Sequence, residues 1–189
     1  MKEYSVQDSK RNMVFGIVVI VYVLLVLAFN IYLSQMVESL GMYAAIVSVL
    51  SISPLPLAML TMRLPIMLKL SNIPNLQGTY EGGLYSNYTN YKKEINVKMT
   101  IKQNVFKMDI LIETETSKSH SVSIDVDKLG DSTLLSYIYE NRGSYSETLS
   151  KHGGVCTLSF FGNDVEGEYY TSPERNTNGK IKLSRCRSE

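Results

Sequence analysis

The stretch that decides the fold is Lys93–Thr114, which reads KEINVKMTIKQNVFKMDILIET. Apolar residues occupy alternate positions in two blocks, 95–101 and 106–112, and polar residues fill all but one of the positions between them. A period of two places successive side chains on opposite faces of a β-strand, so each block predicts a half-buried strand. Asn104-Val105 between the blocks predicts a tight hairpin connection.

The same alternation recurs toward the C-terminus, where turn signals such as Gly162-Asn163-Asp164 separate the apolar stretches. We expect eight strands, at 78–86, 93–103, 106–114, 122–126, 134–140, 154–161, 165–171 and 180–187. Strands in sequence order with short turns and no helix predict an all-β antiparallel meander. Closing it into a small, lipocalin-like, eight-stranded barrel removes the exposed edges, and an open two-sheet sandwich is the alternative. Such a barrel has an interior that holds side chains or one small ligand.

The N-terminal part of the chain has a different character. Residues 13–33 read MVFGIVVIVYVLLVLAFNIYL without a charge, which at ~1.5 Å per residue is enough to cross a ~30 Å hydrocarbon core. The run is longer than the apolar region of a signal peptide and no small-residue cleavage site follows, so we expect a retained transmembrane helix. Residues 41–62 form a second charge-free stretch and predict a second span.

Two prolines, Pro54 and Pro56, interrupt the second predicted span. Each removes a backbone donor, so the helix is expected to kink or unwind locally there. One interpretation is a helix that simply bends. The other is a membrane-span hinge that rearranges when subunits associate.

The charges beside the spans predict their orientation. Three basic residues precede the first span, Arg63 and Lys69 follow the second, and the connection 34–40 has neither Lys nor Arg. Basic residues favour the cytoplasmic side, so a multi-pass protein with both termini in the cytoplasm is expected. The expected organisation is a cytoplasmic tail (1–12), two transmembrane helices (13–33 and 41–62, within 13–63), a tether (64–74) and a cytoplasmic barrel (75–189).

The composition argues against several classes of function. A net charge of +1 does not suit a binder of nucleic-acid polymers, which needs a strong basic excess. Cys156 and Cys186 are expected to be free thiols in the cytoplasm, and two scattered histidines do not suggest a metal site. No recognisable nucleophile elbow or phosphate-binding loop occurs, so we expect a binding protein without a catalytic residue or cofactor.

Part of the predicted barrel is unusually rich in hydroxyls and tyrosines. Tyrosine rings can stack on bases, hydroxyls can hydrogen-bond base edges and sugars, and arginine can pair with a phosphate. A plainer interpretation is that Tyr and Thr are good strand formers and that serines face water. The candidate ligand-binding residues are Tyr80, Thr114, Ser117, Tyr137, Tyr139, His152, Tyr169, Thr171, Arg175 and Thr177.

The order of motifs along the chain resembles a known family. Two apolar spans precede a barrel that carries Gly78-Thr79-Tyr80-Glu81-Gly82, the stretch 113–119, Tyr137-Ile138-Tyr139-Glu140-Asn141, His152-Gly153-Gly154 and Glu168-Tyr169-Tyr170-Thr171, with Arg175, Thr177 and Gly179 behind it. This arrangement is similar to the two-transmembrane β-barrel effectors of bacterial cyclic-oligonucleotide anti-phage signalling (CBASS).

The resemblance implies a mechanism. A nucleotidyltransferase makes a cyclic dinucleotide during infection, the barrel binds it, and the effector subunits associate. The transmembrane segments then disrupt the bacterial inner membrane, and the infected cell dies by abortive infection.

Two other functions fit the same residues. One is a membrane-tethered, lipocalin-like carrier of an apolar ligand, because the opening Gly78-Thr79-Tyr80 is similar to the Gly-x-Trp start of those barrels. The other is an adaptor whose barrel docks a protein. Toxicity that depends on a messenger would separate the effector from both.

Overall fold

The computed structural model describes residues 1–7, 9–36, 44, 46–47, 54–143, 152–173 and 176–186. The chain divides into two compact units. One consists of Met1–Gln7 together with Pro74–Glu189, and the other is Asp8–Ile73. All of the described strands lie in the first unit and the described α-helices lie in the second.

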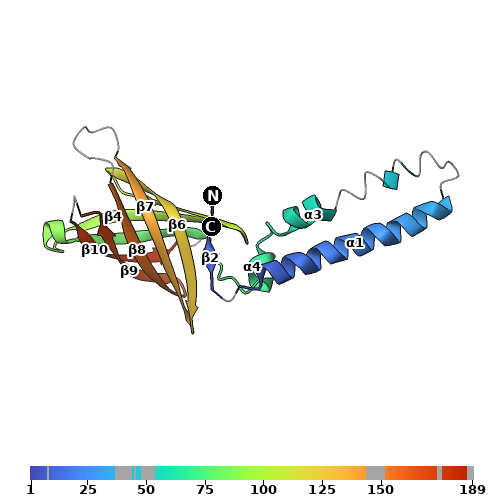
Figure 1. Cartoon of the computed structure of the whole chain (residues 1–189). Coiled ribbons are helices and arrows are strands. Elements are labelled where there is room, and N and C mark those ends of the chain that lie inside the picture. The colour runs from blue at the N-terminus through green and yellow to red at the C-terminus, as the bar shows by residue number, and fades with distance from the viewer. Residues whose placement is uncertain are drawn as a thin grey trace. The chain divides into compact units, whose positions relative to one another are not determined.

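Eight strands of the first unit form a closed ring (Figure 1). They are β3 (Gly78–Ser86), β4 (Glu94–Gln103), β5 (Lys107–Glu113), β6 (Ser117–Leu129), β7 (Ser132–Gly143), β8 (His152–Phe161), β9 (Asp164–Thr171) and β10 (Asn178–Arg185). Each pairs antiparallel with the next in sequence, and β10 pairs back onto β3. The prediction of an eight-stranded antiparallel barrel is therefore confirmed, and the open sandwich is wrong.

The predicted hairpin is the β4–β5 pair, in which Gln103 lies opposite Met108. Its turn is organised by Asn104, whose Oδ1 accepts from the backbone N–H groups of Phe106 (2.9 Å) and Lys107 (2.8 Å). Such a side-chain acceptor satisfies turn donors that have no ladder partner. Val105 is fully buried, so the turn folds inward and closes this end of the barrel.

The end of the barrel beside this turn is filled with side chains. Met99, Met108, Leu135 and Leu158 are each fully buried there. Tyr80 packs edge-on against Phe160 with ring centroids 5.5 Å apart, and its hydroxyl donates to the carbonyl of Leu76 (2.9 Å). Because this half is solid, any ligand space must lie toward the other end.

Residues 1–7 also belong to the barrel unit. They form two short strands, β1 (Lys2–Glu3), antiparallel to β5, and β2 (Ser5–Val6), parallel to β6. No pattern in the sequence predicted these strands, because two residues are too few to show a period.

The second unit contains α1 (Arg11–Met36), α3 (Pro54–Thr61) and α4 (Ile66–Leu70). Of the described helices, α1 alone is long and apolar enough to cross a membrane, over Arg11–Gln35 (Figure 1). The Tyr22 hydroxyl lies 2.7 Å from Thr61 Oγ1 and joins α1 to α3.

Residues 41–43, 45 and 48–53 of the second predicted span, 41–62, lie outside the described residues, so two membrane-spanning helices are not confirmed. Its described C-terminal part is α3, which begins at Pro54. Pro54 and Pro56 lie at the N-terminal edge of the described part of this helix, and residues 48–53 before them lie outside the described residues. Neither proline interrupts α3 as described, and the hinge remains a prediction.

Candidate functional site

A cavity of about 420 Å³ occupies the end of the barrel opposite the Asn104 turn. Every strand of the ring contributes at least one residue to its wall, and these residues include aliphatic side chains, tyrosines and hydroxyls. The polar and aromatic lining residues are Ser86, Tyr88, Thr89, Thr114, Thr116, Ser117, Ser119, Tyr137, Tyr139, Asn141, His152, Tyr169, Thr171 and Thr177. This volume is within the range of small-molecule sites.

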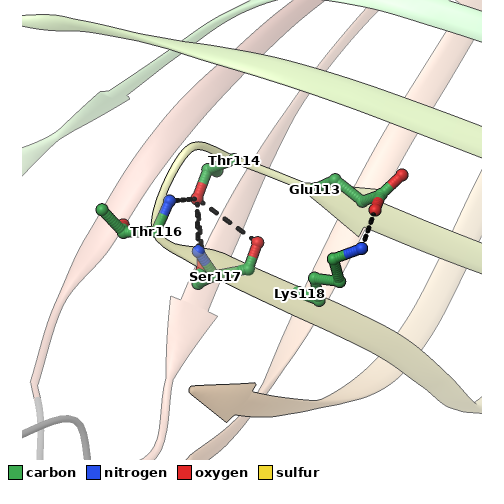
Figure 2. Close-up of polar contacts among 5 residues, drawn as sticks. All are labelled: Glu113, Thr114, Thr116, Ser117 and Lys118. Carbon is green, nitrogen blue, oxygen red and sulfur yellow. Dashed lines mark hydrogen bonds and ion pairs between the residues drawn. The ribbon is translucent and has the colours of Figure 1, made fainter. Parts of the chain in front are cut away.

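Pairs of hydroxyls organise two of the hairpin ends that line the cavity. Between β5 and β6, Thr114 Oγ1 lies 2.9 Å from Ser117 Oγ and accepts from the Ser117 N–H at 3.1 Å (Figure 2). Between β9 and β10, Thr171 Oγ1 lies 3.0 Å from Thr177 Oγ1 and accepts from the Thr177 N–H at 2.8 Å. These contacts hold the two turns in place beside the cavity.

Figure 2 also shows an ion pair at the first of these turns. Lys118 Nζ lies 2.6 Å from Glu113 Oε1, and this hydrogen-bonded ammonium lowers the pKa of the Glu113 carboxyl. Neither residue lines the cavity. The pair therefore braces the outside of the β5–β6 hairpin.

Two tyrosines line the cavity because glycines face them across the sheet. Tyr139 lies opposite Gly154, and Tyr169 lies opposite Gly179. A Cβ atom on Gly154 would lie 2.5 Å from the Tyr139 hydroxyl, and one on Gly179 would collide with the Tyr169 ring. The rings thus lie over bare backbone, an arrangement that fixes aromatic faces along the wall.

Two buried polar atoms of the cavity wall have no oxygen or nitrogen hydrogen-bond partner among the described residues. They are the Tyr137 hydroxyl and Asn141 Oδ1, whose side chains belong to residues 3% and 8% exposed. Burial raises the pKa of Tyr137 well above its ordinary value, and Cys156, directly opposite, adds to the effect. An unpartnered buried polar atom is costly, so such atoms in a cavity wall indicate where a ligand can bind.

Cys156 lies on the cavity wall between these features. Burial raises the pKa of its thiol to about 12. Because the thiolate is the reactive form of cysteine, this side chain is unreactive near neutral pH. It acts as a small apolar wall residue.

The described lining residues offer aromatic faces, hydroxyls, a carboxamide and one histidine. Among them only His152 can carry a positive charge, and no carboxylate is present. Aromatic faces with neutral donors and acceptors are the groups that recognise unpaired nucleobases and sugars. The chemistry of the wall therefore suits a nucleotide-like ligand.

The structure brings eight of the ten sequence-predicted residues to this one cavity: Thr114, Ser117, Tyr137, Tyr139, His152, Tyr169, Thr171 and Thr177. Tyr80 lies instead in the solid end of the barrel, and Arg175 lies outside the described residues. Contact of any of them with a ligand stays a prediction.

The candidate residues chosen from the sequence left out Asn141, Thr116, Ser119 and the hydroxyls near the β3–β4 connection. In the sequence, Asn141 appeared only as the last residue of the motif 137–141. What singles it out is the unpartnered oxygen, which no sequence pattern reports.

A closed eight-stranded barrel with a neutral, aromatic and hydroxyl-lined internal cavity has the architecture of a small-molecule binding protein. The family model described as Cap15, cyclic dinucleotide receptor domain, matches residues 71–185, which include all eight strands of the ring. The chain belongs to this family, and the resemblance to CBASS effectors seen in the sequence is confirmed. No curated protein matches the chain.

Proposed function

We propose that the chain is a membrane-anchored CBASS effector whose barrel cavity binds a cyclic dinucleotide made by a nucleotidyltransferase. Binding drives self-association, and the membrane segments then disrupt the bacterial inner membrane and kill the infected cell. The observation that carries the proposal is the match of residues 71–185 to a cyclic dinucleotide receptor domain, in a chain with an apolar helix long enough to cross a membrane.

In this proposal the bases enter the cavity. One base stacks on Tyr139 or Tyr169, whose rings are held over Gly154 and Gly179. Small adjustments of the wall bring base or sugar groups to the Tyr137 hydroxyl and Asn141 Oδ1, which otherwise have no oxygen or nitrogen partner among the described residues. Stacking on aromatic side chains contributes about 1–3 kcal/mol per base, enough to supply much of the affinity without a basic surface.

The size of the cavity supports a role for the ligand in association. A volume of about 420 Å³ is in the lower half of the range for small-molecule sites, and a cyclic dinucleotide is a bulky ligand. One nucleotide half then lies inside, and the other stays near the mouth, where a second subunit can contact it.

The membrane part of the proposal starts from α1. Its apolar side chains are mostly exposed, as expected for a helix that faces lipid. In the proposed topology residues 41–62 return across the membrane, and both termini lie in the cytoplasm, where the messenger is made. Neither span contains a charged residue, which favours action through assembly over a charged ion path.

The test uses the full chain in detergent and a panel of cyclic di- and trinucleotides, with the linear dinucleotides as controls. A ligand at ~100 times its dissociation constant adds about 2.7 kcal/mol to the free energy of unfolding, which raises the melting temperature by several degrees. The same ligand should then release dye from liposomes that contain the protein. Cooperative melting without a shift from any cyclic dinucleotide would refute the proposal and favour the apolar-ligand or adaptor functions.

A further inference from the structure

The wall of the barrel has one weak seam, between β5 and β6. The two strands pair directly only at Leu111–His120, Ile112–Ser119 and Glu113–Lys118, next to the cavity. Beyond these pairs the Ile110 N–H donates to the Ser121 side-chain oxygen (3.0 Å) instead of to a backbone carbonyl, and β6 carries a bulge between Ser121 and Ser123. The β5–β6 ladder therefore ends early, and the strands separate toward the solid end.

The N-terminal segment, residues 1–7, fills this gap. Lys2 and Glu3 pair with Met108 and Lys107 of β5. Ser5 and Val6 pair with Asp125 and Val126 of β6. The segment thus pairs with β5 and β6 where these two strands do not pair with each other, and it completes the wall.

Tyr4 anchors the segment between its two short strands. It is 4% exposed, its hydroxyl donates to the carbonyl of Asn104 (2.9 Å), and it accepts from Gln103 Nε2 (3.2 Å). Gln103 Nε2 also donates to the Pro74 carbonyl (2.9 Å), while its Oε1 accepts from the Leu76 N–H (2.8 Å). Gln103 therefore binds the chain just before residues 8–73, at Tyr4, and just after them, at Pro74 and Leu76.

The same two strands form part of the cavity wall. Thr114 and Ser117, at the turn that joins them, and Ser119, in the paired region, line the cavity. A ligand that contacts these residues stabilises the paired end of the seam, whereas the N-terminal segment stabilises its separated end. Elements held by few backbone pairs are the first to open, so the segment is the part of this wall most easily shifted.

We propose that the N-terminal segment is a reversible coupling strand: its seating in the β5–β6 seam and ligand binding in the cavity stabilise each other. This inference rests on the proposed ligand site and describes how ligand binding at that site is regulated. Since residue 7 leads within a few residues to α1, a change in seating acts directly on the start of the apolar helix. By linkage, the factor by which the ligand favours seating equals the factor by which seating favours the ligand.

The first arm of the test needs no ligand. Amide hydrogen exchange is measured on the full chain in detergent for Tyr4→Ala and Tyr4→Phe, with Glu3→Gln as a matched control because Glu3 is exposed and pairs through its backbone. Tyr4→Ala should speed exchange in residues 2–7 and also in 110–113 and 117–121, Tyr4→Phe less so, and Glu3→Gln not at all. Unchanged exchange at 110–113 and 117–121 in both Tyr4 variants would overturn the coupling.

The second arm adds cyclic di-AMP, cyclic di-GMP and cyclic di-UMP. A bound ligand should slow exchange of residues 2–7, and Tyr4→Ala should weaken binding by about five-fold or more, although Tyr4 does not line the cavity. Equal affinity in the wild type and Tyr4→Ala would overturn the inference while leaving the proposed function intact. A wild-type protein that binds no cyclic dinucleotide refutes the proposed function, whereas the first arm still decides whether segment and seam are coupled.

Discussion

Tyr139 and Gly154 face each other across the β7–β8 ladder, and the tyrosine occupies the space that any side chain at position 154 would need. The position of the Tyr139 ring in the cavity wall therefore depends on the lack of a side chain at Gly154. Gly154→Ala should displace the Tyr139 ring and press on the carbonyl of Tyr170, at a cost of about 1–3 kcal/mol typical of overpacking.

The measurement for Gly154→Ala is the melting temperature together with the affinity for the activating ligand, and both should fall. Gly83→Ala is the matched control, because the three atoms nearest to its new Cβ all belong to the flexible side chain of Glu94 on the outside of the barrel. Equal behaviour of the two variants would show that the Tyr139 ring is not held in place by Gly154.

Removing the hydroxyl of Tyr137 should separate stability from binding. The Cys156 thiol is at most a weak partner for this hydroxyl, which has no oxygen or nitrogen partner among the described residues. Tyr137→Phe should therefore leave the unliganded protein about equally stable. Ligand affinity should fall by about 1 kcal/mol, or some five-fold, if the hydroxyl bonds the ligand. Calorimetric titration and thermal melting measure the two effects.

Tyr80→Phe is the control for that change. The Tyr80 hydroxyl donates to the Leu76 carbonyl outside the cavity, so its removal leaves a buried acceptor unsatisfied. Stability should drop by about 1–3 kcal/mol with ligand affinity unchanged. The opposite pattern in the pair would place the ligand against Tyr80 and away from Tyr137.

Alkaline pH should destabilise the barrel through Cys156 and Tyr137. Burial raises both pKa values in the folded state, that of Cys156 to about 12, so the native protein keeps protons that the unfolded chain releases. Their contribution is complete below about pH 8.5, where the unfolded groups are still protonated, and is lost as the pH rises toward 12. Each group contributes at most about 1.4 kcal/mol per pH unit in that window.

The check is the melting temperature from pH 7 to 11 for the wild type, Cys156→Ala and Cys186→Ala. Cys156→Ala should flatten the alkaline decline, whereas Cys186, which is exposed, should not affect it. A decline of the same slope in all three proteins would assign the alkaline loss of stability to other groups.

The contact between Tyr22 and Thr61 should contribute modestly to pairing of α1 with α3. Thr61 Oγ1 already donates to the Leu57 carbonyl (2.9 Å), so the Tyr22 hydroxyl acts as the donor to Thr61. Tyr22→Phe should lower the free energy of unfolding in detergent by about 0.6 kcal/mol, the average for hydrogen bonds between membrane helices. Tyr32→Phe, on the exposed part of α1, is the control and should have no effect.

The part of the fold that could be predicted from sequence is the part in which apolar residues face a packed core. The alternation in 93–114 predicted β4 and β5, and Asn104 predicted the turn between them. The prediction of a strand at 122–126 was too short, because β6 begins at Ser117. In the first part of β6 the inward-facing residues Ser117 and Ser119 line the cavity, so this part of the strand lacks the apolar alternation that predicts a strand.

The candidate site was predictable in composition and only partly in geometry. Hydroxyls and tyrosines indicated a polar cavity, whereas the exclusion of Tyr80 depends on which end of a strand is packed. The seating of Tyr4 beside Asn104, 100 residues away in the chain, has no local signal of any kind.

That separation has a consequence for how the protein is made. Residues 1–7 leave the ribosome before the strands that receive them, which are synthesised roughly 100 residues later, or about 5–20 s at usual rates of translation. The apolar helix that begins at Arg11 emerges in the meantime. The barrel wall can therefore be completed only after the apolar helix has been synthesised. In the proposed membrane topology, insertion of that helix then has time to precede closure of the barrel.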